Sequence, residues 1–182
     1  MIVAPTAIRD VLLVQPVLHV DPRGFFVETW HEARYAASGI AGPFVQDNHS
    51  HSVRHALRGL HYQVGRPQGK LVRVASGSVY DVAVDVRRSS PTFGHWVSAE
   101  LSGENQHQLW IPPGFAHGFY VLSAHADMTY KCTAPYAPEL DRTVRWDDPQ
   151  IGIQWPLGEG ATPLLSAKDA AAPLLGDAEG YP

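Results

Sequence analysis

Short runs in which apolar and polar residues alternate dominate the chain, whereas few windows show the 3.6-residue apolar period of an amphipathic helix. Side chains on a strand point alternately to the two faces of a sheet, so such runs are typical of strands with one buried face. Turn residues separate the runs at short intervals. The pattern therefore predicts an all-β sandwich or barrel. The clearest predicted strands are Leu71–Val74, Val79–Val86, Leu109–Ile111, Phe119–Leu122 and Met128–Cys132.

Two short segments predict helices instead. Residues His31–Ser38 are rich in alanine and are followed by Gly39, a residue type that commonly ends helices. Ser166–Asp169 matches the Ser-x-x-Asp pattern of a capping box. The sequence shows no internal repeat and no convincing domain boundary, so residues 1–182 are expected to form one domain. The last dozen residues are rich in alanine, glycine and proline and are expected to be loosely attached.

Composition and charge narrow the classes of protein. The formal net charge of −4 gives no general attraction to nucleic acid or to an anionic membrane, so an anionic ligand needs a local cluster of arginine and lysine. Cys132 is the only cysteine, which excludes an intramolecular disulfide and a thiolate zinc site. No apolar run reaches membrane-spanning length and no signal peptide is visible, so a cytoplasmic location is expected.

The segment Leu57–Gln63, followed by Lys70, brings an arginine, a histidine and a lysine close together in an otherwise apolar stretch. Strict alternation places Arg58 and His61 on opposite faces, and a hairpin over residues 64–68 would return Lys70 beside His61. A titratable imidazole near two fixed cations suits a base that acts on an anionic substrate. The alternative for this segment taken alone is an edge strand with solvated charges and a packed histidine.

The histidines leave a metal site open as a second interpretation. His49 and His51 would share one face of a strand, and with His61 they could bind iron, manganese or zinc in a metal-dependent cupin oxygenase or isomerase. However, no carboxylate stands at ligand spacing between Asp47 and Asp81. The sequence also lacks a nucleophile elbow and the glycine loops of nucleotide-binding folds.

A set of basic and aromatic residues lies on segments that a barrel would bring together. Such a set suits proton abstraction beside a carbonyl, because an imidazole takes the proton, a cation stabilises the enolate and a phenol returns a proton on the opposite face. Packing in the core is the alternative for the tyrosine of this set. Its members are Arg23, Arg58, His61, Lys70, His117 and Tyr130.

Sequence motifs along nearly the whole chain, in order and at matching spacing, resemble one family, the dTDP-4-dehydrorhamnose 3,5-epimerases of the cupin-like sugar-nucleotide epimerases. No single one of these motifs would identify the family, but the whole series in this order does. The matching segments are Asp21–Glu28, Phe44–Ser50, Leu57–Gln63, Gln68–Arg73, Asp81–Asp85, Ser90–Gly94, Ile111–Phe119, Tyr130–Lys131, Trp146–Pro149 and Leu165–Asp169.

The resemblance implies a jelly-roll, cupin-like barrel with short peripheral helices, a homodimer and no metal or other cofactor. It implies that His61 is the general base, that Asp169 orients it, and that Tyr130 donates a proton on the opposite face. Lys70 corresponds to the residue that stabilises the enolate oxygen. Further residues correspond to substrate-binding positions, the first three on a segment that reaches across the dimer: Arg23, Phe26, Glu28, Gln46, Asn48, Arg58, His117, Tyr136 and Lys168.

The implied reaction converts dTDP-4-dehydro-6-deoxy-D-glucose to dTDP-4-dehydro-L-rhamnose by inversion at C3 and C5. The closest alternative is an enzyme of antibiotic-sugar biosynthesis that inverts only one of these carbons, and a non-catalytic sugar-nucleotide-binding protein is a further one. Two positions depart from the family pattern. His55 places a polar residue shortly before the base, and Asp141 stands where the family often has a glutamate, so Asp141 is not predicted to bind substrate.

Overall fold

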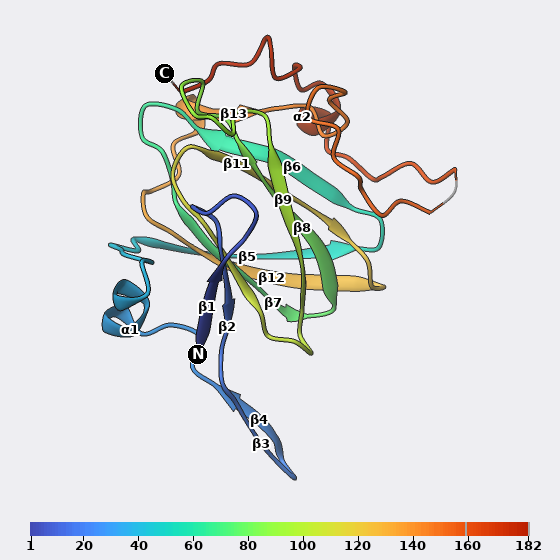
Figure 1. Ribbon diagram of the computed structural model, residues 1–182. Coiled ribbons are helices and arrows are strands. Elements are labelled where there is room, and N and C mark those ends of the chain that lie inside the picture. The colour runs from blue at the N-terminus through green and yellow to red at the C-terminus, as the bar shows by residue number, and fades with distance from the viewer. Residues whose placement is uncertain (159, 182) are drawn as a thin grey trace.

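Two antiparallel β-sheets packed face to face form the body of the computed structural model, which describes residues 1–158 and 160–181 (Figure 1). Side chains from both sheets, such as Val72 and Met128 from one and Val79 and Phe119 from the other, fill the space between them. The first sheet has the order β1 (Ile2–Pro5), β2 (Leu12–Gln15), β10 (Gln108–Ile111), β7 (Lys70–Ser76), β12 (His125–Cys132), β5 (Gln46–Val53). The second sheet has the order β13 (Asp141–Thr143), β6 (Leu57–Gln63), β11 (Phe115–Val121), β8 (Ser78–Asp85), β9 (Trp96–Ser102).

The all-β class is confirmed, because each of the clearest predicted strands overlaps an observed one, in β7, β8, β10, β11 or β12. The expected closed barrel is instead an open sandwich. Within the described residues, β1 and β5 are the edges of the first sheet and β13 and β9 are the edges of the second. Apolar side chains, rather than a continuous hydrogen-bonded ladder, hold the two layers together.

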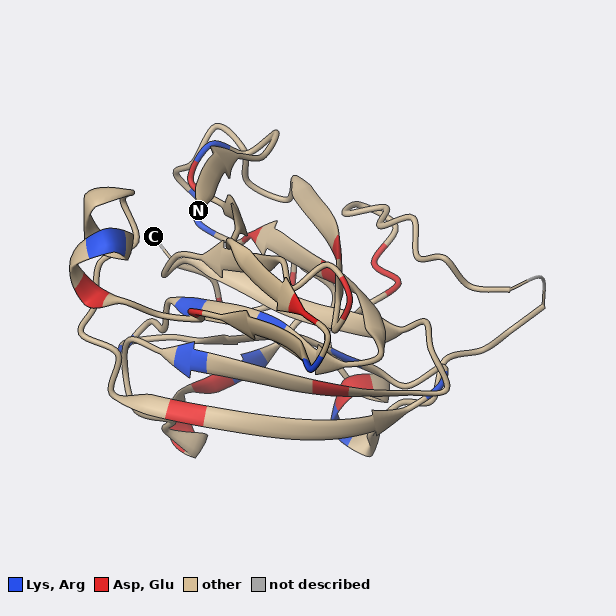
Figure 2. Cartoon of the chain, turned by 90° about the horizontal axis from the view of Figure 1, so that it is seen from below, with Lys and Arg blue, Asp and Glu red and all other residues tan. Residues whose placement is uncertain are grey.

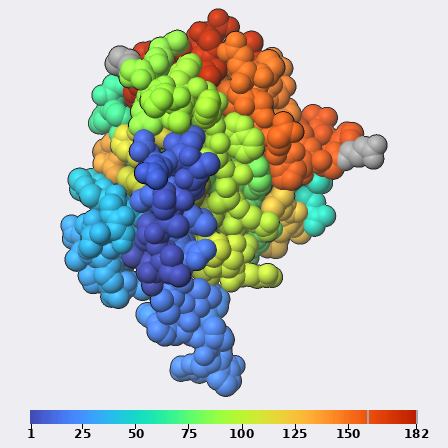
Figure 3. All heavy atoms as spheres, in the orientation of Figure 1, coloured from blue at the N-terminus to red at the C-terminus, as the bar shows by residue number. Residues whose placement is uncertain are grey.

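Smaller elements surround the sandwich. Strands β3 (Leu18–Asp21) and β4 (Gly24–Val27) form a hairpin that projects from the body (Figures 1 and 3). Helix α1 (Glu32–Ala37) and helix α2 (Ala167–Ala170) confirm the two predicted helices, and a short 3₁₀ helix covers Pro138–Leu140. No helix in the described part of the chain is long and apolar enough to cross a membrane.

The connection from β6 to β7 corrects the predicted hairpin. These strands belong to different sheets, so residues 64–69 carry the chain from the second sheet to the first. The expected proximity is nevertheless present, because the Lys70 ammonium Nζ is 3.4 Å from the backbone oxygen of His61. Lys70 therefore meets His61 across the interior of the sandwich and not along one sheet.

A β-bulge in strand β6 changes which side chains share a face. His117 pairs with His61 and Phe119 pairs with Arg58, so three steps on β6 match two steps on β11. Gly59 lies in this bulge with a φ of +128°, and a Cβ there would be 2.5 Å from the Cα of Gly118. The extra residue breaks strict alternation. As a result, Arg58 and His61 line one pocket, although alternation predicts opposite faces.

The C-terminal segment, which the sequence predicts to be loosely attached, packs against the second sheet in its described part. Leu175 and Ala178 are buried in a cluster with residues of β6 and β8. The hydroxyl of Tyr181 donates to the backbone oxygen of Gln63. Residue 182 lies outside the described residues.

Asp85, at the end of β8, holds the following loop in place through hydrogen bonds. Its fully buried carboxylate accepts hydrogen bonds from Arg87 at 2.7 Å and from the hydroxyls of Ser90 and Thr92, each at 2.6 Å. Burial acts against ionisation, but these hydrogen bonds outweigh it and lower the pKa of Asp85 to about 2. The ionised carboxylate therefore stabilises the folded state.

Replacement of Asp85 by asparagine should lower the free energy of unfolding at pH 7 by about 2 kcal/mol. Because the folded-state pKa lies below the unfolded-state value, the contribution is complete above about pH 5 and should fall to about half at pH 3. Urea unfolding of both proteins at the two pH values measures the difference. An equal difference in the free energy of unfolding at pH 7 and pH 3 would show that the carboxylate charge does not contribute to stability.

Candidate active site

One pocket of about 620 Å³ lies between the two sheets and the segment that carries α2. Charged and polar side chains from both sheets line it. Figure 2 shows that basic and acidic residues are distributed over the strands and loops of the whole chain. The predicted site residues that line this pocket are Gln46, Asn48, Arg58, His61, Lys70, His117, Tyr130, Tyr136, Lys168 and Asp169.

His61 and Asp169 form a hydrogen-bonded pair in this pocket. The imidazole Nε2 is 2.6 Å from Oδ1 of Asp169, which is buried, whereas the His61 side chain is 32 % exposed. Burial acts to raise the pKa of Asp169, but the hydrogen bond and charge of His61 outweigh it, so this pKa lies below its usual value. An ionised Asp169 holds the proton on Nε2 and leaves the lone pair of Nδ1 available.

Local structure fixes Asp169 in this position. The side chain of Ser166 accepts a hydrogen bond from the backbone N–H of Asp169, as the capping-box pattern predicts. Just before it, Leu164 exchanges backbone hydrogen bonds with His55 and Leu57 at 2.8 and 3.0 Å. The start of β6 and the start of α2 are therefore held together, and with them the two members of the pair.

Lys70 and Tyr130 reach the pocket from the first sheet, opposite His61. Lys70 lies at the start of β7 and is 8 % exposed, and burial lowers the pKa of its ammonium group. Tyr130 lies on the neighbouring strand β12, and burial raises the pKa of its phenol, so the hydroxyl keeps its proton at neutral pH. The pocket thus has an imidazole on one wall and a phenol and an ammonium group on the other.

Arg58 and His117 lie on the wall formed by the second sheet. The guanidinium of Arg58 donates to the hydroxyl of Ser52 at 2.9 Å and to the backbone oxygen of His51 at 3.3 Å. His117 is buried, and its Nε2 is 2.8 Å from Oδ2 of Asp81.

A polar network lines the opposite rim. The amide of Gln46 donates to Asn48 at 3.0 Å and accepts from the backbone of Tyr136 at 2.8 Å. The hydroxyl of Tyr136 donates to Asp141 at 3.0 Å, and Lys168 forms an ion pair with the same carboxylate. Asp141 therefore lines the pocket beside two predicted substrate-binding residues, although sequence reasoning left it out.

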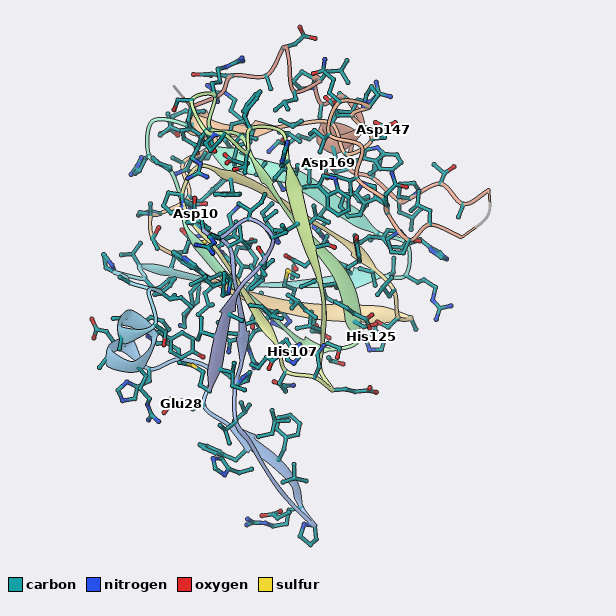
Figure 4. All side chains as sticks on the ribbon, in the orientation of Figure 1. Asp10, Glu28, His107, His125, Asp147 and Asp169 are labelled. Atoms are coloured by element: carbon teal, nitrogen blue, oxygen red, sulfur yellow. The ribbon has the colours of Figure 1, made fainter. Side chains whose placement is uncertain are left out.

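Three predicted residues lie away from the pocket. Arg23 pairs with Asp21 at the tip of the β3–β4 hairpin, and Phe26 on the same hairpin is 70 % exposed. Glu28 pairs with Arg34 at 2.7 Å, and it lies beside α1, far from Asp169 in the view of Figure 4. These residues do not line the pocket of their own chain, because the hairpin that carries Arg23 and Phe26 projects away from the body and Glu28 directly follows this hairpin (Figure 1).

The histidines of the metal interpretation do not come together. His49 and His51 both contact Oδ1 of Asp127, at 2.9 and 3.0 Å, on the exposed face of β5. Their neighbours Asn48 and Ser50 point into the pocket that contains His61, so the two histidines lie on the opposite face of the strand. Within residues 1–158 and 160–181, no group of three or more histidine, cysteine or acidic side chains has metal-binding geometry.

Sequence reasoning also missed several lining residues. Ser50 follows Gln46 and Asn48 at two-residue steps, so alternation along β5 could have identified it. Its hydroxyl is buried and lacks a hydrogen-bond partner in the described part of the chain. Cys132 faces Lys70 across the β12–β7 ladder and accepts a hydrogen bond from Asn48, a contact that no sequence signal indicated.

Comparisons with known proteins show the family of this chain. The family model of dTDP-4-dehydrorhamnose 3,5-epimerase matches residues 5–177. The chain is 54 % identical to the dTDP-4-dehydrorhamnose 3,5-epimerase of Salmonella typhimurium, over 98 % of this chain and 97 % of that protein.

Two solved structures are similar over most of the chain. One is the 3,5-epimerase RmlC of Legionella pneumophila in complex with dTDP-4-keto-L-rhamnose, which is 54 % identical with a TM-score of 0.93 and covers 96 % of this chain and 93 % of that one. The other is ChmJ of Streptomyces bikiniensis, a 3'-monoepimerase in complex with dTDP-quinovose. It is 36 % identical with a TM-score of 0.87, and the match covers 95 % of this chain and 87 % of that one. This chain belongs to the dTDP-4-dehydrorhamnose 3,5-epimerase family.

Proposed function

We propose that the protein is a dTDP-4-dehydrorhamnose 3,5-epimerase that converts dTDP-4-dehydro-6-deoxy-D-glucose to dTDP-4-dehydro-L-rhamnose. The observation that carries the proposal is the His61–Asp169 pair on one wall of a pocket whose other wall holds Lys70 and Tyr130. Full-length relatives that share about half of the sequence carry the same activity in their names.

Proton removal is assigned to His61. Because Nε2 is engaged by Asp169, Nδ1 is the nitrogen that can accept a proton from a carbon next to the ketone. The ionised Asp169 then stabilises the imidazolium that forms. Protons on C3 and C5 are both acidified by the C4 ketone, so the same base can serve both positions in turn.

The enolate that results carries its negative charge on the C4 oxygen. Lys70 supplies a cation from the buried wall of the pocket, where low polarity strengthens its attraction for that oxygen. Tyr130 then donates its phenolic proton to the carbon from the side opposite His61, which inverts the configuration. Solvent reprotonates the phenolate and removes the proton from His61 before the second round.

Substrate binding is assigned to the remaining polar residues of the pocket. Arg58 suits the diphosphate, because a guanidinium near phosphate oxygens forms charge-assisted hydrogen bonds. His117 is assigned to the sugar. The rim is assigned to the nucleotide, where the ring of Tyr136 is 53 % exposed and available for stacking. The residues proposed for the rim are Gln46, Asn48, Tyr136 and Lys168.

We infer a homodimer in which the projecting hairpin and the residue that follows it supply Arg23, Phe26 and Glu28 to the partner's pocket. Exposed apolar side chains on the hairpin support this arrangement, since Val20 is 74 % and Phe26 is 70 % exposed. We also infer one jelly-roll domain over residues 1–182, supported by successive strands from β5 onward that mostly alternate between the two sheets. The cytoplasmic location stays a prediction from the sequence.

The proposal is tested by incubating the purified protein with dTDP-4-dehydro-6-deoxy-D-glucose and determining the product's configuration by NMR. We expect inversion at both C3 and C5, and the same rate after treatment with a chelator. Inversion at one carbon alone would favour the mono-epimerase alternative, which the similarity to ChmJ keeps open. Turnover that the chelator abolishes would contradict the proposed mechanism and favour the metal-dependent alternative.

A further inference from the structure

His55, which departs from the family pattern, has a backbone conformation that is uncommon for residues other than glycine. It lies in the turn between β5 and β6 with a φ of +66°, in the left-handed region. A side chain in this region crowds the backbone. Such a conformation persists only where surrounding contacts hold it, and residues of this kind gather at functional sites. Two sets of contacts, one from the side chain and one from the backbone, hold His55 in this conformation.

The side chain of His55 provides the partner of a buried hydroxyl. Its Nδ1 is hydrogen-bonded to the hydroxyl of Tyr120, and the two ring centroids are 5.9 Å apart. Tyr120 lies on β11 and is 2 % exposed, and its hydroxyl has no other hydrogen-bond partner in the described part of the chain. A buried hydroxyl without a partner is costly. This hydrogen bond therefore stabilises the turn in its left-handed form.

The backbone of His55 connects two segments that lie on opposite sides of the start of β6. On one side the oxygen of Ala56 accepts from Val121 of β11 at 3.0 Å, and on the other the N–H of Leu57 donates to Leu164 at 3.0 Å. In an extended strand, the N–H and the C=O of one residue point to the same side. The N–H of His55 instead donates to Val121 at 3.2 Å, whereas its C=O accepts from Leu164 at 2.8 Å. The left-handed φ makes this double connection possible.

The segment that begins at Leu164 depends on this junction for its position. Leu164 is 56 % exposed, and residues 164–168 include no buried residue, so burial does not fix them. The same segment leads to Asp169, whose Oδ1 is 2.6 Å from Nε2 of His61. His61 lies on β6, which begins beside His55. Both members of the pair are therefore attached to the junction at His55.

We propose that His55 is a positioning residue, whose left-handed backbone and hydrogen bond to Tyr120 hold Asp169 in contact with His61. His55 does not line the pocket, so it acts only through the segment that leads to Asp169. A displacement of this segment lengthens the hydrogen bond that fixes the tautomer and the orientation of His61. The expected effect on turnover rests on the proposed epimerase function, whereas the expected effect on the tautomer of His61 does not.

The test separates the backbone of His55 from its side chain. His55→Gly keeps the left-handed φ and removes the ring, whereas valine is strongly disfavoured at this φ, so His55→Val also displaces the backbone. We expect kcat to fall about 10-fold in His55→Gly and about 100-fold in His55→Val, because a small displacement of a catalytic group has effects of this size. Tyr120→Phe should resemble His55→Gly, and the double variant should lose no more than either single one.

The tautomer of His61 is the readout that a loss of stability alone does not change. At about pH 9, where histidines are generally neutral, NMR of the ring nitrogens should place the proton of wild-type His61 on Nε2. The signal of His61 is identified by its absence from the spectrum of His61→Asn. We expect both tautomers in His55→Val, and a smaller fraction of the Nδ1–H form in His55→Gly and Tyr120→Phe.

Gln106→Gly is the matched control. Gln106 is the other non-glycine residue with a positive φ within the described residues, at +53°, and it does not line the pocket. Its replacement should leave kcat and the tautomer of His61 unchanged.

A single tautomer of His61 in folded His55→Val, whatever its kcat, would overturn the inference, and so would equal effects in Gln106→Gly. If His55→Val does not fold, a single tautomer in both His55→Gly and Tyr120→Phe would overturn it. Wild-type protein that fails to epimerise the sugar would contradict the proposed function itself, whereas an active wild type whose variants keep one tautomer contradicts only the role of His55.

Discussion

Replacement of His61 by asparagine should lower kcat by at least about 10²-fold to 10⁴-fold, with little change in the affinity for dTDP. The reason is that the amide cannot accept a proton from carbon, although it can still hydrogen-bond to Asp169. Initial rates of sugar epimerisation and calorimetric titration with dTDP measure the two effects separately.

His49→Asn is the matched control for this experiment. His49 lies on the exposed face of β5 and contacts Asp127 instead of the pocket, so its replacement should leave kcat unchanged. Comparable losses in His49→Asn and His61→Asn would point to a shared metal site and contradict the assignment of the base. Unchanged epimerisation by His61→Asn would show that His61 is not the base.

Replacement of Tyr130 by phenylalanine should separate proton removal from proton return. The ring still fills its place between β7 and β5, but no acid remains on the wall opposite His61. We expect product formation to fall by about 10²-fold to 10⁴-fold. In deuterated water, the recovered substrate should still gain label at the carbons beside the ketone, because His61 can return a solvent deuteron to the face from which it took the proton.

Tyr136→Phe serves as the control for this prediction. Its hydroxyl donates to Asp141 at the rim of the pocket, so its loss should raise KM without changing how label divides between substrate and product. Equal loss of label and product in Tyr130→Phe would contradict the role of Tyr130 as the acid. Such a result would indicate that the phenol is needed for proton removal or for binding.

Local sequence pattern predicted the elements of this fold well, because they depend on neighbouring residues. Alternation placed the central strands, and the Ser-x-x-Asp pattern placed α2 with Ser166 as its cap. The pattern could not predict that β6 and β7 belong to different sheets, since the apolar period of a strand is the same in either layer. For the same reason, it could not distinguish a closed barrel from an open sandwich.

Prediction of the site required information that the local sequence pattern does not contain. Alternation separated Arg58 from His61, and only the bulge at Gly59, with its close approach to Gly118, brings both to one pocket. The pairing of His61 with Asp169 joins residues far apart in the chain, and family resemblance predicted it where spacing could not. Resemblance also named Arg23, Phe26 and Glu28, which lie away from the pocket of their own chain.

In the proposed mechanism, one base and one acid on opposite walls of the pocket act at both carbons beside the ketone. Turnover of dTDP-4-dehydro-6-deoxy-D-glucose by the wild-type protein in deuterated water, followed by NMR of the product, tests it most directly. We predict deuterium at both C3 and C5 in a product inverted at both carbons. Deuterium at a single carbon, or inversion without any deuterium, would contradict this mechanism.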